Sequence, residues 1–485
     1  MRNMAGLVQL EAKVFAGDRF NLSLTLLLVV LLLYGLWNGR TWVANEQHTI
    51  DNARRAQRIA TERGKQAASN IVARKTAAES IFYDPTSPGV VAGMFFGGHY
   101  AILPPAALSP LAIGQSDLRP SYIKVALQPE QDVLSVSEIE NPETLLTGHF
   151  DFSFVCVYVL PLFLLAISYQ ILSEDLETGN LSLLLTQNVS LLMLLTARNV
   201  VRLSVAIACT GTCLLLAIIS AGTELANPAV WWNALLLWAA IAVYSAFWLA
   251  VSSAINLSGR KSSFTAIALV ACWLGFALIV PSLVNLYANR LYPPPSRITQ
   301  IQESRRAADA AAARGAQTLQ NFLNDHPDLA PQNANAGMTD FYASTLAVRT
   351  EAQNAVAPTL RRFAIEQSQR DRFLRRFRFL SPAILMRIAL EDAAGSGDAR
   401  YEQFMQQVRG YYKQWVDFFS WRIIQQKRFG PSDYDIIPAF HYVPESGSAV
   451  AIGELSAIAG IAVPGAIVAV IVGLLGVRFK PIQRF

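Results

Sequence analysis

Acidic residues and leucines stand close together in the stretch ILSEDLETGNLSLLLTQNVS at 171–190, which joins two long apolar segments. Gly179 separates the two groups and is expected to turn the chain. Asn180 or Ser182 could cap a short helix after this turn. The leucines would then form an apolar stripe that lies along a membrane surface or in the groove of a partner protein. These leucines are Leu181, Leu184 and Leu185.

Sequence motifs for catalysis are missing. The chain contains no G-x-x-x-x-G-K-[ST], G-x-S-x-G, H-E-x-x-H or C-x-x-C motif. Without a phosphate-binding loop, the chain is not expected to hold nucleotide phosphates itself. We therefore expect no cofactor in this chain and no ATPase site of its own.

The cysteines and histidines give only weak signals of chemistry. Cys209 and Cys213 share one helix face, and we interpret them as packing residues because no histidine lies near them. His99, His326 and His441 fall in segments outside the expected membrane helices. An enzyme with an outward-facing active site is an alternative, but these histidines have no nucleophile or carboxylate at a suggestive spacing.

Composition places these residues in a membrane protein. The 485 residues are 53% hydrophobic and 15% charged, whereas a soluble domain carries about 25% charged residues. A helix needs about 20 apolar residues to cross a bilayer. Six segments satisfy this requirement: 20–38, 150–172, 199–222, 229–255, 264–288 and 455–477.

The interiors of these six spans are expected to carry no Asp, Glu, Lys or Arg. Ion-coupled carriers usually keep such residues near the membrane midplane, so the sequence argues against a secondary transporter. The milder polar residues are more consistent with helix packing than with a cavity. They are Ser153, Ser168, Thr210, Thr212, Ser252, Ser253 and Thr265.

Basic residues follow the expected topology. They flank the first span, lie in the loop at 256–263 and follow the last span, whereas the short loop at 223–228 has none. The positive-inside rule therefore places both termini in the cytoplasm. Because the net charge of +5 follows topology, we expect membrane lipid but no nucleic acid as a partner.

The predicted fold class is an all-α polytopic membrane protein with six transmembrane helices and two large, mostly helical extracytoplasmic segments. The first outer segment begins with a charged, alanine-rich stretch that is expected to continue the first span as a helix. Proline and glycine interrupt the second outer segment between helical stretches. The expected layout is 1–38, 39–149, 150–288 with a cytoplasmic connection at 173–198, 289–454 and 455–485.

The connection at 173–198 resembles the coupling segment of type 2 ABC exporter permeases, which carries the pattern E-x-x-x-G-T-L-x-x-L-L-x-x-P-x-S followed by a lysine. Asn180 replaces the threonine and Asn188 stands where proline is usual. The resemblance implies contact with an ATPase subunit. The matching residues are Glu174, Glu177, Gly179, Leu181, Leu184, Leu185, Ser190 and, at the basic position, Arg198.

Three further stretches, 110–120, 380–412 and 433–440, resemble a bacterial subgroup of these permeases with an outer domain of unknown function. The resemblance implies the permease subunit of an exporter in the bacterial inner membrane. A separate ABC ATPase would bind ATP and Mg²⁺, and a second permease half, identical or a sister chain, would complete the dimer. The alternative is mechanotransmission, in which the subunit acts on a periplasmic partner and nothing crosses. The sequence does not identify the substrate.

Overall fold

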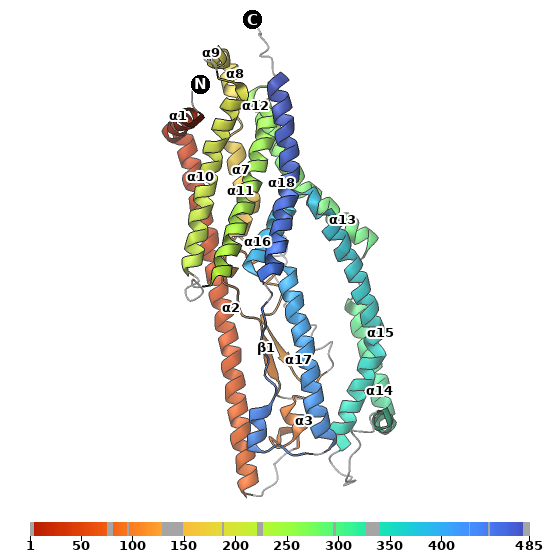
Figure 1. The fold of residues 1–485 in the computed structure, drawn as a ribbon. Coiled ribbons are helices and arrows are strands. Elements are labelled where there is room, and N and C mark those ends of the chain that lie inside the picture. The colour runs from red at the N-terminus through yellow and green to blue at the C-terminus, as the bar shows by residue number, and fades with distance from the viewer. Residues whose placement is uncertain are drawn as a thin grey trace.

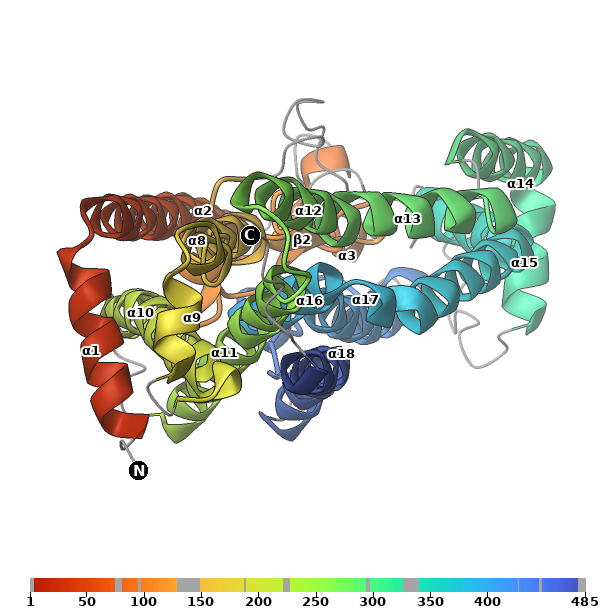
Figure 2. The ribbon, with the colours of Figure 1, turned by 90° about the horizontal axis from the view of Figure 1, so that it is seen from above.

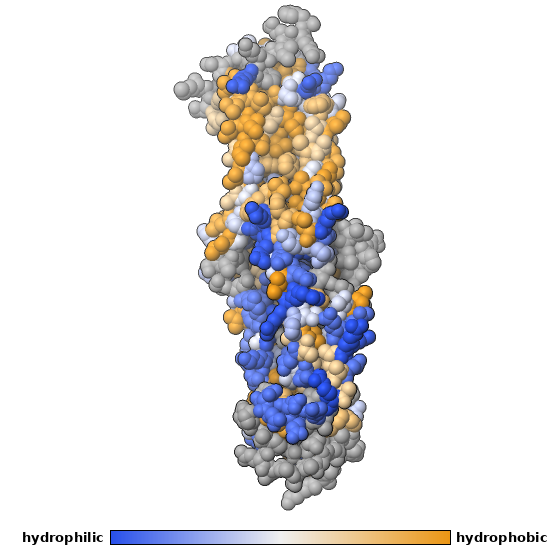
Figure 3. Space-filling model, turned by 90° about the vertical axis from the view of Figure 1, so that its right-hand side faces the viewer, coloured by the Kyte–Doolittle hydropathy of each residue, from blue (hydrophilic) through white to orange (hydrophobic). Residues whose placement is uncertain are grey.

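The computed structural model describes residues 4–74, 81–94, 97–128, 149–186, 189–220, 227–293, 297–325, 340–425, 427–444 and 447–478. The molecule is elongated and largely helical (Figure 1). Apolar side chains cover one end, and hydrophilic ones cover much of the rest (Figure 3). This division is that of a membrane protein with a large portion outside the bilayer.

Five helices in the described part of the chain are long and apolar enough to cross a membrane. The sixth expected span, 150–172, instead contains a shorter apolar helix at Phe152–Ala166, built from α6 (Phe152–Phe154), η3 (Val155–Val159) and α7 (Leu160–Ala166). The five longer helices are α2 (Arg19–Arg74), α10 (Leu191–Ser220), α11 (Pro228–Asn256), the continuous run α12 (Ser262–Leu274), η5 (Gly275–Ile279) and α13 (Val280–Leu291), and α18 (Gly447–Arg478).

Helix α11 is the centre of the membrane portion. In the most apolar 18-residue stretch of α11, 61% of the residues are buried, compared with 11% in the corresponding stretches of α12–α13 and of α18. Helices α10, α16 and α18 pack directly against α11. The other long spans bury a smaller share of their apolar residues and present most of their own apolar surface outward.

Two spans contain π-helical turns, each followed by a proline. Pro161 follows η3 and Pro281 follows η5, and because proline has no N–H, the carbonyls one turn earlier lose a donor. Side chains from other helices replace these donors. Tyr244 Oη donates to the Val157 carbonyl at 2.8 Å, and Ser381 Oγ donates to the Phe276 carbonyl at 2.6 Å.

Helix α2 runs unbroken from the membrane portion into the outer portion, as the sequence predicts. Its 56 residues span about 84 Å at 1.5 Å per residue. Glycines allow it to pack closely: a Cβ atom on Gly39 would lie 2.0 Å from the Pro110 carbonyl oxygen. Helix α1 (Met4–Gly17) precedes it at the membrane end.

The outer portion has its own hydrophobic core, centred on Trp415 and Phe419 of α17 (Asp398–Ile424). A two-stranded antiparallel sheet, β1 (His99–Ile102) and β2 (Tyr122–Val125), packs there with His99 opposite Val125. The sequence indicated irregular structure here. The other outer elements are η1 (Ile81–Tyr83), α3 (Pro88–Val91), η2 (Ser109–Leu111), α14 (Arg297–Asp325), α15 (Asp340–Phe377), η7 (Arg378–Leu380) and η8 (Pro431–Ile436).

Helix α16 (Pro382–Ala394) differs in place from the sequence expectation, which put it with the outer helices. Its apolar residues, including Leu385, Met386 and Leu390, belong to the same core as the spanning helices. Ser381 caps it and also reaches the carbonyl of Phe276, within the α12–α13 run. Helix α16 therefore inserts among the membrane helices without crossing the membrane.

Candidate functional site

The connection between the second and third predicted spans forms two short helices, α8 (Ser173–Glu177) and α9 (Asn180–Thr186). Gly179 lies between them with φ at +76°, a conformation that favours glycine. Helices α8 and α9 lie at the same end of the molecule as α1 and the last turns of α18 (Figure 1), and the view along the molecule shows α9 over α10 and α11 (Figure 2). The turn that the sequence indicates at Gly179 is thus present, followed by the expected helix.

Arg198 fixes this connection to two neighbouring helices. Its Nη1 lies 2.6 Å from Asp175 of α8 and its Nε lies 3.2 Å from Glu11 of α1. All three side chains are less than one-fifth exposed. Arg198 also donates to the carbonyl of Ile171. The basic residue that the sequence assigned to partner contact therefore holds α1, α8 and α10 together.

Glu177 connects the same segment to a second spanning helix, α12. Its Oε1 accepts hydrogen bonds from the backbone N–H of Ser262 at 2.7 Å and from the Ser262 hydroxyl at 3.0 Å. Ser262 begins α12, where backbone N–H groups favour a negative charge. These hydrogen bonds lower the pKa of Glu177. A displacement of α8 would therefore be transmitted to α10 and to α12.

The leucines divide between the inside and the outside of the connection. Leu181 is buried against Leu194 and Leu257, and Leu184 is partly buried in the same cluster. Leu183 is 65% exposed, although the sequence did not select it for the stripe. The side chain of Leu185, and the whole of Asn188, lie outside the described residues. Among the side chains of α9 that the structure describes, Leu183 is an apolar residue that faces outward.

The remaining site residues are either exposed or cap a helix. Glu174 is exposed, as are Gly179 and Asn180. Ser190 Oγ accepts from the backbone N–H of Met193 at 3.2 Å and so caps α10. Ser190 is a structural residue in this position, whereas Glu174 is free to face a partner.

A buried polar network that the sequence did not reveal lies directly behind the connection. Asn256 Oδ1 accepts from the N–H of Leu172 at 3.3 Å, and its Nδ2 donates to the carbonyl of Ser252 at 2.9 Å. Asn199 donates to Ser253 Oγ at 2.8 Å. An asparagine in the last turn of an apolar helix, here Asn256 in α11, is the sequence feature that could have revealed this network, because a buried amide needs hydrogen-bond partners.

Arg202 lies inside the predicted span 199–222 and contradicts the expectation of an uncharged interior, whereas Glu454 lies one residue before the predicted span 455–477. Arg202 lies in α10, where its Nε donates to the carbonyl of Ile167 at 2.7 Å, just after the short helix α7 ends. Glu454 lies in the outer turns of α18, fully buried, and neither of its carboxyl oxygens has a hydrogen-bond partner among the described residues. Glu454 was left out of the predicted span because that span begins at 455, although α18 begins at Gly447.

The cysteines and histidines do not assemble into a metal site in the described part of the chain. His99 packs at 5.0 Å from the Trp415 ring, and burial lowers its pKa to about 4. His99 is therefore neutral at physiological pH. His441 is exposed, with Nδ1 at 3.2 Å from the carbonyl of Ala439. His326 lies outside the described residues.

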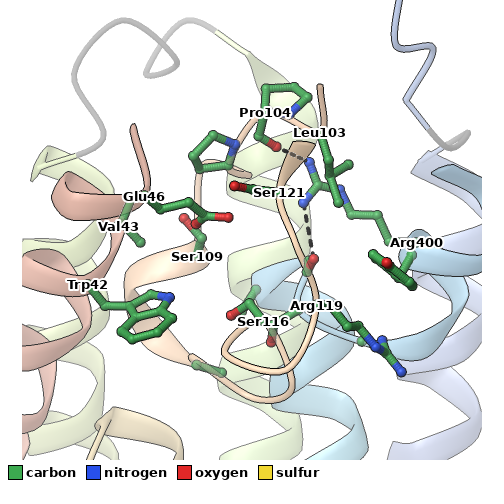
Figure 4. A pocket seen from close by; sticks show the side chains of 17 residues that line it. Trp42, Val43, Glu46, Leu103, Pro104, Ser109, Ser116, Arg119, Ser121 and Arg400 are labelled. Carbon is green, nitrogen blue, oxygen red and sulfur yellow. Dashed lines mark hydrogen bonds between the residues drawn. The ribbon is translucent and has the colours of Figure 1, made fainter. Parts of the chain in front are cut away.

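A small cavity of about 40 Å³ lies where the loop at 103–121 meets α16 and α17 (Figure 4). Arg400 closes it by donating to the carbonyls of Pro104 at 2.6 Å and Gly395 at 3.0 Å. A space of this size holds a few water molecules at most. Arg400 thus has a structural role, joining the loop to the α16–α17 turn.

Comparison with known proteins identifies one family match. Residues 297–443 match the model of a family described as "Domain of unknown function (DUF3526)". The match spans α14 to the end of the outer portion, including α16 and α17. No curated protein and no solved structure matches the chain.

Proposed function

We propose that this protein is the permease subunit of an ATP-driven ABC exporter and that α8, Gly179 and α9 form the contact with a separate ATPase. The observation that carries the proposal is the anchoring of this exposed connection. Arg198 and Glu177 fix it to α1, α10 and α12, while Glu174 and Leu183 face outward. A push on such a segment moves several membrane helices together.

The remaining parts of the proposal come from the family resemblance. The ATPase would bind ATP and Mg²⁺, and a second permease half would complete the dimer. Both termini, α8 and α9 would lie in the cytoplasm of a bacterial cell, and six segments would cross the inner membrane. The shorter apolar helix Phe152–Ala166 supports the sixth crossing only together with the turns that continue to Leu172.

A pull-down of the tagged protein from native membranes in mild detergent tests the proposal. Wild-type protein should retain a co-purifying ATPase, identified by its phosphate-binding loop and by ATP hydrolysis in the eluate. Leu183→Asp should reduce this ATPase at least tenfold, because it places a charge at an apolar contact. Ile436→Asp, at a side chain that is 55% exposed in the outer portion, is the matched control and should change nothing.

The proposal fails if well-folded wild-type protein retains no ATPase. Equal retention by wild type and Leu183→Asp would move the contact away from α9. Neither outcome depends on knowing the substrate.

A second candidate function is mechanotransmission, in which ATP hydrolysis moves the outer portion against a periplasmic partner. The unbroken helix α2 favours it, because one rigid element joins the membrane helices to the outer core. Ser282 lines a cavity of about 970 Å³ whose walls come from α13, α15, α16 and α17, and Ser282→Trp separates the two functions. Retained complementation of a deletion strain favours mechanotransmission, whereas loss, with Leu283→Trp as the control, favours transport.

A further inference from the structure

A cavity of about 970 Å³ lies where the outer portion meets the membrane helices. Its walls come from α13, from the C-terminal part of α15, from α16 and from the start of α17. This volume is in the range that holds a small-molecule ligand. The cavity lies on a different part of the molecule from α8 and α9, so the proposed ATPase contact does not explain it.

One part of the wall is apolar and belongs to the membrane helices. Tyr158 comes from η3, Ala277 and Pro281 come from the α12–α13 run, and Ile384 and Ile388 come from α16. Since α16 inserts among the spanning helices, this part of the cavity is level with the membrane. It offers a surface for a hydrocarbon chain.

Arginines on α15 and η7 form the second part of the wall. Arg370 Nη2 donates to Asn289 Oδ1 of α13 at 2.9 Å, and Arg378 Nη2 donates to Ser456 Oγ of α18 at 3.4 Å. Each guanidinium is thus held against the outer end of a spanning helix. In the described part of the chain each guanidinium uses only its Nη2 group in hydrogen bonds, and since a guanidinium carries five N–H donors, others remain for an anion.

Carboxylates on the opposite wall are largely engaged with other arginines. Asp398 pairs with Arg119, and Glu391 pairs with Arg387 at 3.7 Å. Burial raises the pKa of Glu391 to about 7, so this carboxyl carries only part of a negative charge near neutral pH. Asp371, Asp392 and Glu402 also line the cavity and offset part of the positive charge, so hydrogen bonds from Arg370 and Arg378, and not an excess of charge, are what the cavity offers an anion.

We propose that this cavity binds an amphiphile with an anionic headgroup, with the headgroup at Arg370 and Arg378 and the apolar chain along Tyr158, Ala277 and Ile388. Guanidinium groups bind phosphate and carboxylate oxygens in pairs of hydrogen bonds. That the amphiphile is the transported substrate rests on the proposed function, whereas its binding does not.

Binding is measured on purified protein in neutral maltoside micelles, without any ATPase. The probes are dioctanoyl phosphatidylglycerol, dioctanoyl phosphatidylcholine and glycerol phosphate. We expect phosphatidylglycerol to bind at least tenfold more tightly than either of the others, because only this probe combines a net negative headgroup with apolar chains. Rising salt should weaken the binding.

Arg370→Gln and Arg378→Gln should each weaken the binding of phosphatidylglycerol about tenfold, as expected for the loss of a charge-assisted hydrogen bond. Arg372→Gln is the matched control, because Arg372 is exposed on the same helix and donates to Ser368 of its own turn. Thermal unfolding within the range of the control shows that a variant is folded. Val284→Trp, at a residue that lines the cavity, provides a second variant that acts by volume and not by charge.

Three outcomes overturn the inference. Equal binding of the two lipids would show that the anionic headgroup is not recognised. Equal binding of glycerol phosphate and phosphatidylglycerol would show that the apolar chains do not contribute to binding. Unchanged affinity in the Arg370→Gln/Arg378→Gln double variant, folded and monodisperse, places the lipid elsewhere. Because no ATPase is present, each of these results leaves the pull-down test of the proposed function unaffected.

Discussion

Arg198 lies between Asp175 and Glu11, which come from different helices. Removing one member of a buried ion pair leaves the other charges without compensation, and such changes cost about 3–5 kcal/mol. We expect Arg198→Ala to lower the stability of the membrane portion by this order, as measured by thermal unfolding in detergent. Arg54→Ala removes a pair in which both side chains are more than two-fifths exposed and should cost at most about 1 kcal/mol.

Glu391 provides a pH-dependent contribution to stability. Its pKa is raised to about 7 in the folded protein, so between about pH 4.5 and pH 7 the folded state binds more of this proton than the unfolded state. Stability should therefore fall as the pH rises through this window, by up to about 3 kcal/mol. Glu391→Gln removes this contribution, and unfolding of the two proteins at several pH values measures the difference. A difference that does not vary with pH would contradict the assignment.

At the residue scale, sequence reasoning was most successful where the backbone dictates the residue type. Gly179 was identified as a turn and is one, because its positive φ excludes most side chains. Arg202 and Asn256 were missed, since what makes them acceptable in apolar helices is a set of carbonyls brought close by tertiary packing. Leu183 was missed because the predicted stripe directed Leu181 toward a membrane or a partner, whereas Leu181 is buried inside this chain.

At the scale of elements, the π-helical turns depend on donors from neighbouring helices. Tyr244→Phe removes the hydroxyl that serves the carbonyl of Val157 and changes little else. An unsatisfied buried carbonyl costs about 1–3 kcal/mol, so this variant should unfold at a lower temperature. The comparison variant is Tyr34→Phe on the exposed surface of α2, for which we expect no measurable change.

Helix α2 packs closely against the loop at Pro110 through Gly39. A methyl group at Gly39 would meet the backbone of Pro110, which cannot move aside as a flexible side chain can. Gly39→Ala should destabilise the protein by about 1–3 kcal/mol through overpacking. Gly6→Ala in α1 has no atom within 4 Å of the new methyl group and should be neutral or stabilising by about 0.5 kcal/mol. Equal effects of the two changes in thermal unfolding would exclude this explanation.

The helices themselves were largely predictable. The extension of the first span into the outer portion, and the helices corresponding to α14, α15 and α17, follow from helix-forming composition bounded by proline and glycine. The shortened helix at Phe152–Ala166 was not predictable from hydropathy, because its length is set by the π-helical turn and by the turns after Ala166. The insertion of α16 was also hidden, since its 13 residues are too few to signal contact with the membrane core.

At the scale of the whole molecule, two hydrophobic cores are stacked along the long axis, one among the membrane helices and one around Trp415. Trp415→Ala should cost the outer core about 3–5 kcal/mol and also removes the hydrogen bond to the carbonyl of Ala92. Hydrogen exchange should then rise in α17, β1 and β2 but not in α10 or α11. The control is Trp421→Ala, whose side chain is 40% exposed. Faster exchange in α11 would show that the two cores unfold as one unit.

Because α2 is long, the far end of the outer portion lies at a distance from the cavity near the membrane helices. A bilayer core of about 30 Å accounts for little more than a third of its roughly 84 Å, so the far end of the outer portion stands on the order of 50 Å above the membrane. The cavity of about 970 Å³ lies where the outer portion meets the membrane helices, and the core around Trp415 lies within the outer portion. If the outer portion acts on a partner, a binder held at its far end should block that action and leave the binding of an amphiphile in the cavity unchanged.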